Sequence, residues 1–263
     1  MKKIAVQLYS VRDHACKDFT GTLKKIADIG FAAVEPAGFW NIRPSEFKKI
    51  VNDMGMEITS AHSPWVNNPD CLGEAMDTAD AIGLKTVTTG YAPDNFKDMD
   101  AIKRTAENTN KLIEILSRNG YSLMQHNHHF EFERLDGRLK YEIYRELCPQ
   151  VNYQLDSFWS TCLGKEDPVE MLKLFSDKVV SVHIKDGFCR QDIAETENVF
   201  LSSKVVLQPV GTGSMPIPEL MANIPDRVRY IIVELDNCEL EMFEALKRSY
   251  EYLVSNGFAC GQK

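Results

Sequence analysis

The sequence lacks the features that mark several large classes of protein. No apolar run approaches the roughly 20 residues that span a bilayer, so we expect no transmembrane helix. Polar residues soon interrupt the opening "MKKIAVQLYSVRD", which predicts no secretory signal. Seven cysteines are scattered without a C-x-x-C pair, a pattern typical of reduced thiols in a cytoplasmic protein.

Positive charge is also in deficit. The chain has 30 lysines and arginines against 38 aspartates and glutamates, which gives a formal net charge of −8. An overall field of that sign opposes nucleic-acid binding. No linker or shift in composition divides the chain, so residues 1–263 are expected to form a single domain.

What the sequence does contain is a strand-and-helix unit repeated eight times. Apolar runs predict strands at residues 4–9, 31–35, 56–62, 84–89, 121–126, 151–156, 178–184 and 228–236. Amphipathic segments predict helices at 18–29, 44–54, 71–82, 98–119, 141–147, 168–175, 218–224 and 239–256. Eight such units in this length are typical of a closed α/β barrel, the (β/α)₈ TIM barrel. An open doubly wound sheet rarely needs eight units, and the chain has no G-x-G-x-x-G phosphate loop after its first strand.

In such a barrel the active site lies at the carboxyl ends of the strands. The predicted strand ends favour histidine, aspartate and glutamate, whereas ordinary surface turns would be richer in lysine, serine, glycine and asparagine. Four of the six histidines fall at just two of these ends. The residues are Gln7, Glu35, His62, Thr88 or Thr89, His126, His128, His129, Asp156, His183, Lys185, Glu234 and Asp236.

The stretch "VVSVHIKDG" (179–187) begins as a buried strand and ends in ionisable residues. Strand alternation places His183 and Lys185 on one face. Asp156 ends the preceding strand and Glu234 ends the following one, so a carboxylate lies on each side of the histidine. Such a set suits one divalent ion, Mn²⁺, Zn²⁺, Mg²⁺ or Co²⁺. The alternative is an ion-pair network of the same residues without a metal.

Five motifs resemble the xylose isomerase-like TIM barrels, a group that includes sugar phosphate isomerase/epimerases, ketose 3-epimerases and inosose dehydratase. They occur in order over nearly the whole chain: "QLYSVR" (7–12), "QHNHHFEF" (125–132), "QLDSFW" (154–159), "VHIKDG" (182–187) and "VELD" (233–236). The resemblance implies a metal-dependent isomerase or epimerase that moves a proton next to the carbonyl of a sugar or keto-sugar, through an enediolate.

Three other functions stay open within this resemblance. One is an inosose dehydratase-like or other keto-sugar lyase. Another is a barrel that only binds sugar, although the retained acidic and histidine residues argue against it. The remote one is a DNA-repair endonuclease of the same superfamily, which six histidines and a charge of −8 disfavour.

The family's metal is held by two glutamates, one aspartate and one histidine. The resemblance implies that Asp156, His183 and Glu234 supply three of these ligands. Met124 or Gln125 stands where the other glutamate would be, so Glu131 is expected as the fourth ligand, with His126 or His128 as substitutes. A histidine ligand would put the epimerase mechanism with its paired carboxylates in doubt.

The resemblance also implies roles around the metal. Glu234 and Glu131 are expected to transfer protons, and Lys185 to hold a substrate or enediolate oxygen while Asp186 orients it. The expected substrate contacts are Gln7, Glu35, His62, His126, His128, Lys185 and Trp159. We expect a small-molecule substrate and no nucleic-acid or membrane partner, and a homo-oligomer is left open.

Two further segments raise expectations. Backbone N–H groups of "GTGSMPIPE" (211–219) precede a predicted helix and could cradle a phosphate. Residues 188–209 are long for a loop, which predicts a lid or a contact with a partner.

Overall fold

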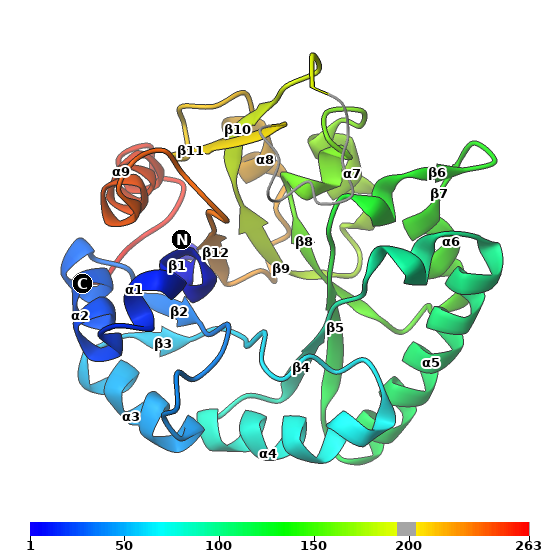
Figure 1. Cartoon of the computed structure of the whole chain (residues 1–263), viewed down its shortest axis with the longest axis horizontal. Coiled ribbons are helices and arrows are strands. Elements are labelled where there is room, and N and C mark those ends of the chain that lie inside the picture. Colours follow the sequence, from blue (N-terminus) through cyan, green and yellow to red (C-terminus); the bar gives the residue numbers. More distant parts are fainter. Residues whose placement is uncertain (194–203, 263) are drawn as a thin grey trace.

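Strands and helices alternate around a ring in the computed structural model, which describes residues 1–193 and 204–262 (Figure 1). One sheet of parallel strands has the order β3-β2-β1-β12-β9-β8-β5-β4. Its strands are β1 (Lys3–Gln7), β2 (Ala33–Glu35), β3 (Glu57–Ile58), β4 (Thr86–Thr89), β5 (Ser122–His126), β8 (Asn152–Asp156), β9 (Val179–Ile184) and β12 (Tyr230–Val233). The predicted (β/α)₈ TIM barrel is therefore confirmed.

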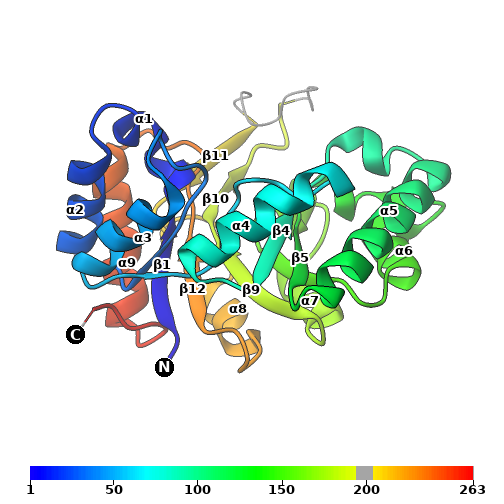
Figure 2. The same ribbon diagram turned by 90° about the horizontal axis from the view of Figure 1, so that it is seen from below.

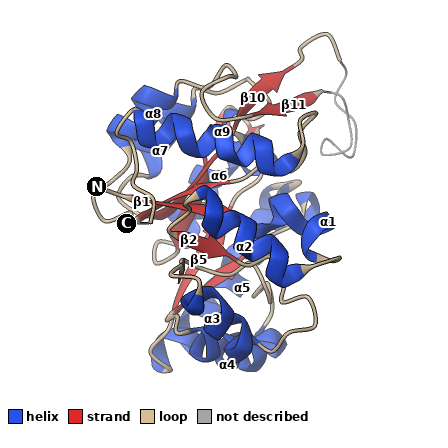
Figure 3. Ribbon diagram, turned by 90° about the vertical axis from the view of Figure 1, so that its left-hand side faces the viewer, coloured by secondary structure: helices blue, strands red, loops and turns tan. Residues whose placement is uncertain are grey.

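Helices form the outer layer (Figure 3), and the longer ones, such as α2, α5 and α9, present an apolar stripe to the sheet. They are α1 (Arg12–Ala15), α2 (Phe19–Ile29), α3 (Pro44–Asp53), α4 (Leu72–Ile82), α5 (Met99–Arg118), α6 (Lys140–Leu147), α7 (Pro168–Phe175), α8 (Ile217–Asn223) and α9 (Met242–Ser255). Gly30 and Gly83 end α2 and α4 in the left-handed conformation, as the sequence predicts.

The ring is least regular between β3 and β4, the two edges of the sheet. The apolar run at 56–62 predicts a longer strand than β3, which covers Glu57–Ile58 alone. In the described residues no ladder joins β3 to β4; instead Val66 N donates to Thr88 O at 3.0 Å. The segment after β3, which carries His62, therefore partly closes the barrel at this point.

The barrel interior changes from apolar to polar along its axis. Ala5, Ala33 and Ile232 form a small apolar cluster inside it. Two residues further along their strands come Gln7, Glu35 and Glu234, all buried. Strand alternation keeps these pairs on the same inward face, so the polar layer lies at the carboxyl ends of the strands.

Two small antiparallel hairpins lie outside the main sheet. β10 (Asp186–Cys189) pairs with β11 (Val205–Gln208), and β6 (Arg134–Leu135) pairs with β7 (Arg138–Leu139). The β10–β11 hairpin leaves the ring at the end opposite the two termini (Figure 2). The segment expected as a lid includes residues 194–203, which lie outside the described residues. No helix in the described ranges combines the length and apolar composition needed to cross a membrane.

Candidate active site and metal centre

Register brings the predicted residues of three neighbouring strands together. Asp156 on β8 lies directly beside His183 on β9. Glu234 immediately follows β12, and Lys185 follows β9 by one residue. All four residues are buried, with exposed fractions of 4% or less. An apolar strand can thus end in a histidine and a lysine because both point into a polar interior lined with carboxylates.

The His183 imidazole lies between two carboxylates. Its Nδ1 is 2.7 Å from Glu234 Oε2, and its Nε2 is 2.6 Å from Glu35 Oε2. Burial by itself would lower the pKa of His183, but the charges of Glu35 and Glu234 outweigh burial and raise the pKa to about 10. The ring is therefore an imidazolium here, and it can bind a metal ion through Nδ1 only by giving up that proton.

The Lys185 ammonium contacts three carboxylates. Its Nζ lies 2.8 Å from Asp156 Oδ2, 2.9 Å from Glu234 Oε2 and 2.9 Å from Asp236 Oδ2. It also lies 5.2 Å from the centre of the Trp159 ring. Burial opposes the charged amine, yet these carboxylates raise the pKa of Lys185 well above its ordinary value. A protonated amine cannot attack a carbonyl, which disfavours Schiff-base chemistry.

Glu35 lies beneath this group and is fully buried. Gln7 Nε2 donates to its Oε2 at 2.8 Å, Gln154 Nε2 donates to its Oε1 at 2.7 Å, and Ser60 Oγ donates to the same oxygen. Burial alone would raise the pKa of Glu35, but the nearby histidines and donors lower it to about 2. Protein donors occupy both of its oxygens. Glu35 and Gln7, which were expected to contact substrate, do not line the cavity beside this group. Glu35 instead holds His183 and Gln154 in place, and Gln7 holds Glu35.

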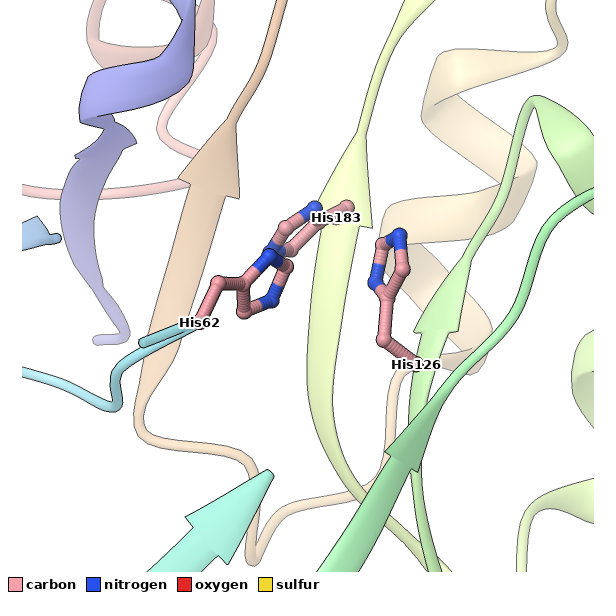
Figure 4. A group of neighbouring side chains, drawn as sticks. All are labelled: His62, His126 and His183. Atoms are coloured by element: carbon pink, nitrogen blue, oxygen red, sulfur yellow. The ribbon is translucent and has the colours of Figure 1, made fainter. Parts of the chain in front are cut away.

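Three imidazoles converge inside the barrel: His62 from the segment after β3, His126 at the end of β5 and His183 on β9 (Figure 4). Their ring centres lie 4.7 Å apart for His62 and His126, 4.8 Å for His126 and His183, and 5.3 Å for His62 and His183. Burial lowers the pKa of both His62 and His126. Both are thus neutral rings, the form that ligates metals.

Two overlapping groups in the described residues have ligand atoms within 4.8 Å of one another. One is His62, His126 and His183, and the other is His126, Asp156, His183 and Glu234. The second group fits a divalent ion, because it offers two imidazoles and two carboxylates from four adjacent strand ends. Around it, four carboxylates (Glu35, Asp156, Glu234 and Asp236) face two cationic side chains, an excess of negative charge that a cation would neutralise.

Glu131, the expected fourth ligand, belongs to neither group among the described residues. It lies in the short 3-10 helix Phe130–Phe132, fully buried, and its Oε2 accepts from His128 N at 2.9 Å. Among the described residues its Oε1 has no hydrogen-bond partner, and burial raises the pKa of this carboxyl to about 8. The chain turns into that helix after β5, which carries Glu131 away from the cluster and leaves His126 facing it.

A cavity of about 300 Å³ opens beside the cluster. It is lined by Tyr9, Ala37, His62, Trp65, His126, His128, Trp159, Lys185, Glu234 and Asp236. A hollow of about 570 Å³ at the amino ends of the strands is larger, but it contains none of the clustered residues. The clustered ionisable residues therefore identify the smaller cavity as the candidate active site. Its volume suits one small polar molecule.

Sequence reasoning named six residues of this cavity: His62, His126, His128, Trp159, Lys185 and Glu234. It missed Tyr9 at the cavity and Gln154 behind the histidines. Tyr9 gave no signal, because it ends the predicted first strand as an ordinary aromatic residue. Gln154 could have been found, since it precedes Asp156 by two and so shares its inward face. Its amide links Glu35 to His62 and His126.

Asp186 does not orient Lys185, so that prediction is wrong. Its Oδ1 accepts from Gly187 N at 2.8 Å and Met215 N at 3.0 Å, and its Oδ2 accepts from Gly211 N and Gly213 N at 2.9 Å each. The backbone donors that were expected to cradle a phosphate therefore hold a carboxylate of the chain itself. Asp236 takes the place beside Lys185 instead.

Comparison with known proteins agrees with this geometry. The chain resembles a sugar phosphate isomerase/epimerase from Parabacteroides distasonis, with 22% identity, coverage of 98% of this chain and 95% of that chain, and a TM-score of 0.74. It also resembles a probable 3-DHS dehydratase from Bacillus anthracis, with 14% identity, coverage of 97% of this chain and 99% of that chain, and a TM-score of 0.72. The IOLI protein, solved with a zinc atom, is 16% identical, with coverage of 96% of this chain and 97% of that chain, and a TM-score of 0.70. At such low sequence identities, these TM-scores show a shared fold and no more.

No curated protein sequence matches the chain. The model of one protein family does match it, over residues 23–253 and thus over most of its length. That match, together with the eight parallel strands and the acidic and histidine residues at their carboxyl ends, places the chain in the xylose isomerase-like TIM barrel family.

Proposed function

We propose that this protein is a divalent-metal-dependent enzyme that moves a proton next to the carbonyl of a small sugar or keto-sugar, as an isomerase or epimerase. The observation that carries the proposal is the cluster of His126, Asp156, His183 and Glu234 beside a cavity of about 300 Å³. The named isomerase/epimerase and the zinc-containing IOLI protein, which share the fold, support it.

The four clustered residues would hold the ion, and the ion would act as a Lewis acid on a bound carbonyl. Glu234 is the best placed base, because it lines the cavity and remains ionised: Lys185 and His183 lower its pKa below the ordinary range although burial opposes this. Lys185 lines the same cavity and would donate to a substrate oxygen that gains negative charge.

The walls of the cavity suit a sugar. Trp65, which is half-buried, offers an apolar face against which the C–H face of a sugar ring can pack, and the buried Trp159 forms another part of the wall. His128 and Asp236 supply polar contacts. Burial, and then the charge of Lys185, lower the pKa of His128 to about 3, so its neutral ring serves for hydrogen bonding to hydroxyl groups.

A keto-sugar lyase is the second candidate, and the position of Glu131 favours it. Epimerisation through paired carboxylates needs a second carboxylate on the other face of the substrate, and Glu131 does not line the cavity. Dehydration needs one base for the α-proton and an acid for the leaving hydroxyl, roles that Glu234 and Lys185 can fill from one side. The dehydratase with the same fold supports this reading.

The test uses purified protein stripped of metal and reloaded separately with Mn²⁺, Co²⁺, Zn²⁺ or Mg²⁺. Keto-pentoses, keto-hexoses, their phosphates and inososes are incubated with each sample in D₂O and followed by NMR. We expect deuterium at one carbon next to the carbonyl, with a rearranged sugar for an isomerase or epimerase and loss of a hydroxyl for a lyase. No exchange across this panel, in samples shown to hold the ion, would overturn the proposal.

A further inference from the structure

We propose that Gln154 is a positioning residue that fixes His62 and His126 in opposite tautomers, so that the lone pair of each ring lies on a defined nitrogen and His126 is prepared to bind a metal ion. Gln154 lies on β8 and is fully buried. Its Oε1 is 2.6 Å from His62 Nε2 and 3.2 Å from His126 Nδ1. Both rings therefore converge on one amide oxygen.

The orientation of the Gln154 amide follows from its other partners. Its Nε2 donates to Glu35 Oε1 at 2.7 Å and to Ser181 Oγ at 3.1 Å. Glu35 Oε1 also accepts from Ser60 Oγ, so this oxygen serves as an acceptor and faces the amide nitrogen rather than the amide oxygen. A flipped amide would set a carbonyl against a carboxylate in a buried site. All four hydrogen-bonding positions of the side chain are used in the observed orientation.

The tautomers of the two histidines follow from that orientation. An amide oxygen only accepts hydrogen bonds, so each ring nitrogen that faces it must carry a proton. His62 is then protonated at Nε2 and His126 at Nδ1. In the neutral form of each ring the lone pair is then on the other nitrogen, which is Nδ1 of His62 and Nε2 of His126.

This arrangement matters because His126 belongs to both groups of candidate ligands. A ring whose tautomer is already set binds an ion without first moving a proton. Hydrogen-bond partners behind metal-bound histidines typically change metal affinity by about 10–100-fold. The inference deepens the proposed metal site, but the tautomers themselves are a property of the metal-free protein.

The first test needs no variant of Gln154. Long-range ¹H–¹⁵N NMR of the metal-free protein distinguishes a protonated from an unprotonated ring nitrogen, and His62→Phe and His126→Phe assign the two rings by loss of their signals. We expect a proton on Nε2 of His62 and on Nδ1 of His126 at neutral pH. The same tautomer in both rings, or rapid exchange between tautomers in either, would overturn the inference.

The second test compares Gln154→Met with Gln125→Met. Gln125 is a matched control, because it is a fully buried glutamine on the adjacent strand β5, and alternation turns it to the face opposite His126. Zn²⁺ affinity is measured by competition with a chromophoric chelator. We expect a loss of about 10–100-fold for Gln154→Met and less than threefold for Gln125→Met. Equal losses in the two variants would refute the role of Gln154.

The two tests separate this inference from the proposed function. If the wild-type protein binds no divalent ion, the metal part of the proposed function fails, whereas the NMR measurement still decides the tautomers. If the ion binds and the sugars react but the two rings share one tautomer, the inference about Gln154 fails alone.

Discussion

Lys185 and His183 stand two residues apart on one strand face, but their surroundings give them different tasks. His183 has a nitrogen toward each of two carboxylates, and its Nδ1 is 4.0 Å from Asp156 Oδ2. Lys185 reaches the cavity and holds three carboxylates around one ammonium. The first is placed to ligate an ion, and the second to neutralise charge near the substrate.

We therefore expect Lys185→Met to separate stability from catalysis. Without metal, the variant should be less stable by about 3–5 kcal/mol, because the buried carboxylates of Asp156 and Glu234 and the partly exposed one of Asp236 lose their shared cation. Added Zn²⁺ or Mn²⁺ should raise its melting temperature more than that of the wild type, since the ion replaces part of the missing charge. Turnover should stay about a hundredfold lower even when the metal is bound.

Thermal unfolding with and without metal, metal analysis and a turnover assay check this expectation. Lys140→Met is the control, since Lys140 is a buried lysine paired with a single carboxylate, that of Glu133, away from the cavity. Wild-type turnover in Lys185→Met would exclude the assigned role of Lys185 toward substrate.

A second residue-scale prediction concerns the fourth ligand. His126 lies within the cluster and Glu131 does not, so His126→Ala should lower the bound metal per chain sharply while Glu131→Gln leaves it near the wild-type level. Inductively coupled plasma analysis of both variants after identical loading measures this. Loss of metal in Glu131→Gln alone would restore Glu131 as a ligand.

Sequence reasoning succeeded where strand periodicity carries the information. Asp156, His183 and Glu234 end apolar runs, so their side chains had to meet at one end of a parallel barrel. Periodicity could not place Glu131, because the chain leaves β5 and turns into a short helix before reaching it. Nor could it reveal that Asp186 turns away from Lys185, since that depends on a loop 25 residues further along the chain.

At the scale of elements, Asp186 joins the end of β9 to the loop before α8. Its two oxygens accept four backbone N–H groups, from Gly187, Gly211, Gly213 and Met215. At Gly213 a Cβ would collide with the Asp186 carboxylate and with Gly187 N, so the close approach requires glycine there. The "GTGS" motif is thus explained by a carboxylate of the chain itself.

Asp186→Asn should destabilise the protein by about 2–5 kcal/mol, because an amide nitrogen would face backbone donors that it cannot satisfy. Asp77→Asn, an exposed position on α4, should change stability by less than about 0.5 kcal/mol. Urea unfolding of both variants and the wild type compares them. Equal midpoints for Asp186→Asn and the wild type would show that these hydrogen bonds add nothing.

At the scale of the whole molecule, the polar end of the barrel concentrates buried ionisable groups that cost stability. Most have partners of opposite charge within 3 Å, such as Glu234 with Lys185 and Glu35 with His183. Glu131 differs, because its partner at His128 is a neutral backbone N–H. Burial therefore dominates the pKa of Glu131. Replacing this residue should isolate its contribution to the pH dependence of the free energy of unfolding.

The sign follows from the pKa of Glu131, which burial raises from about 4.5 to about 8. Below pH 4.5 the carboxyl is protonated in both the folded and the unfolded chain. Between pH 4.5 and 8 the unfolded chain releases this proton and the folded chain keeps it, so the wild type loses about 1.4 kcal/mol of stability per pH unit from this group. Above pH 8 the loss levels off.

Glu131→Gln removes that proton while its amide oxygen can still accept from His128 N. The variant should match the wild type near pH 4.5 and become more stable as pH rises, with the difference levelling off above pH 8. Denaturant unfolding from pH 5 to 9 measures the difference, and the exposed Glu107→Gln is the control. A difference that does not change with pH would mean that the pKa of Glu131 is not raised and that Glu131 is ionised in the folded protein, which would reopen its assignment as a metal ligand.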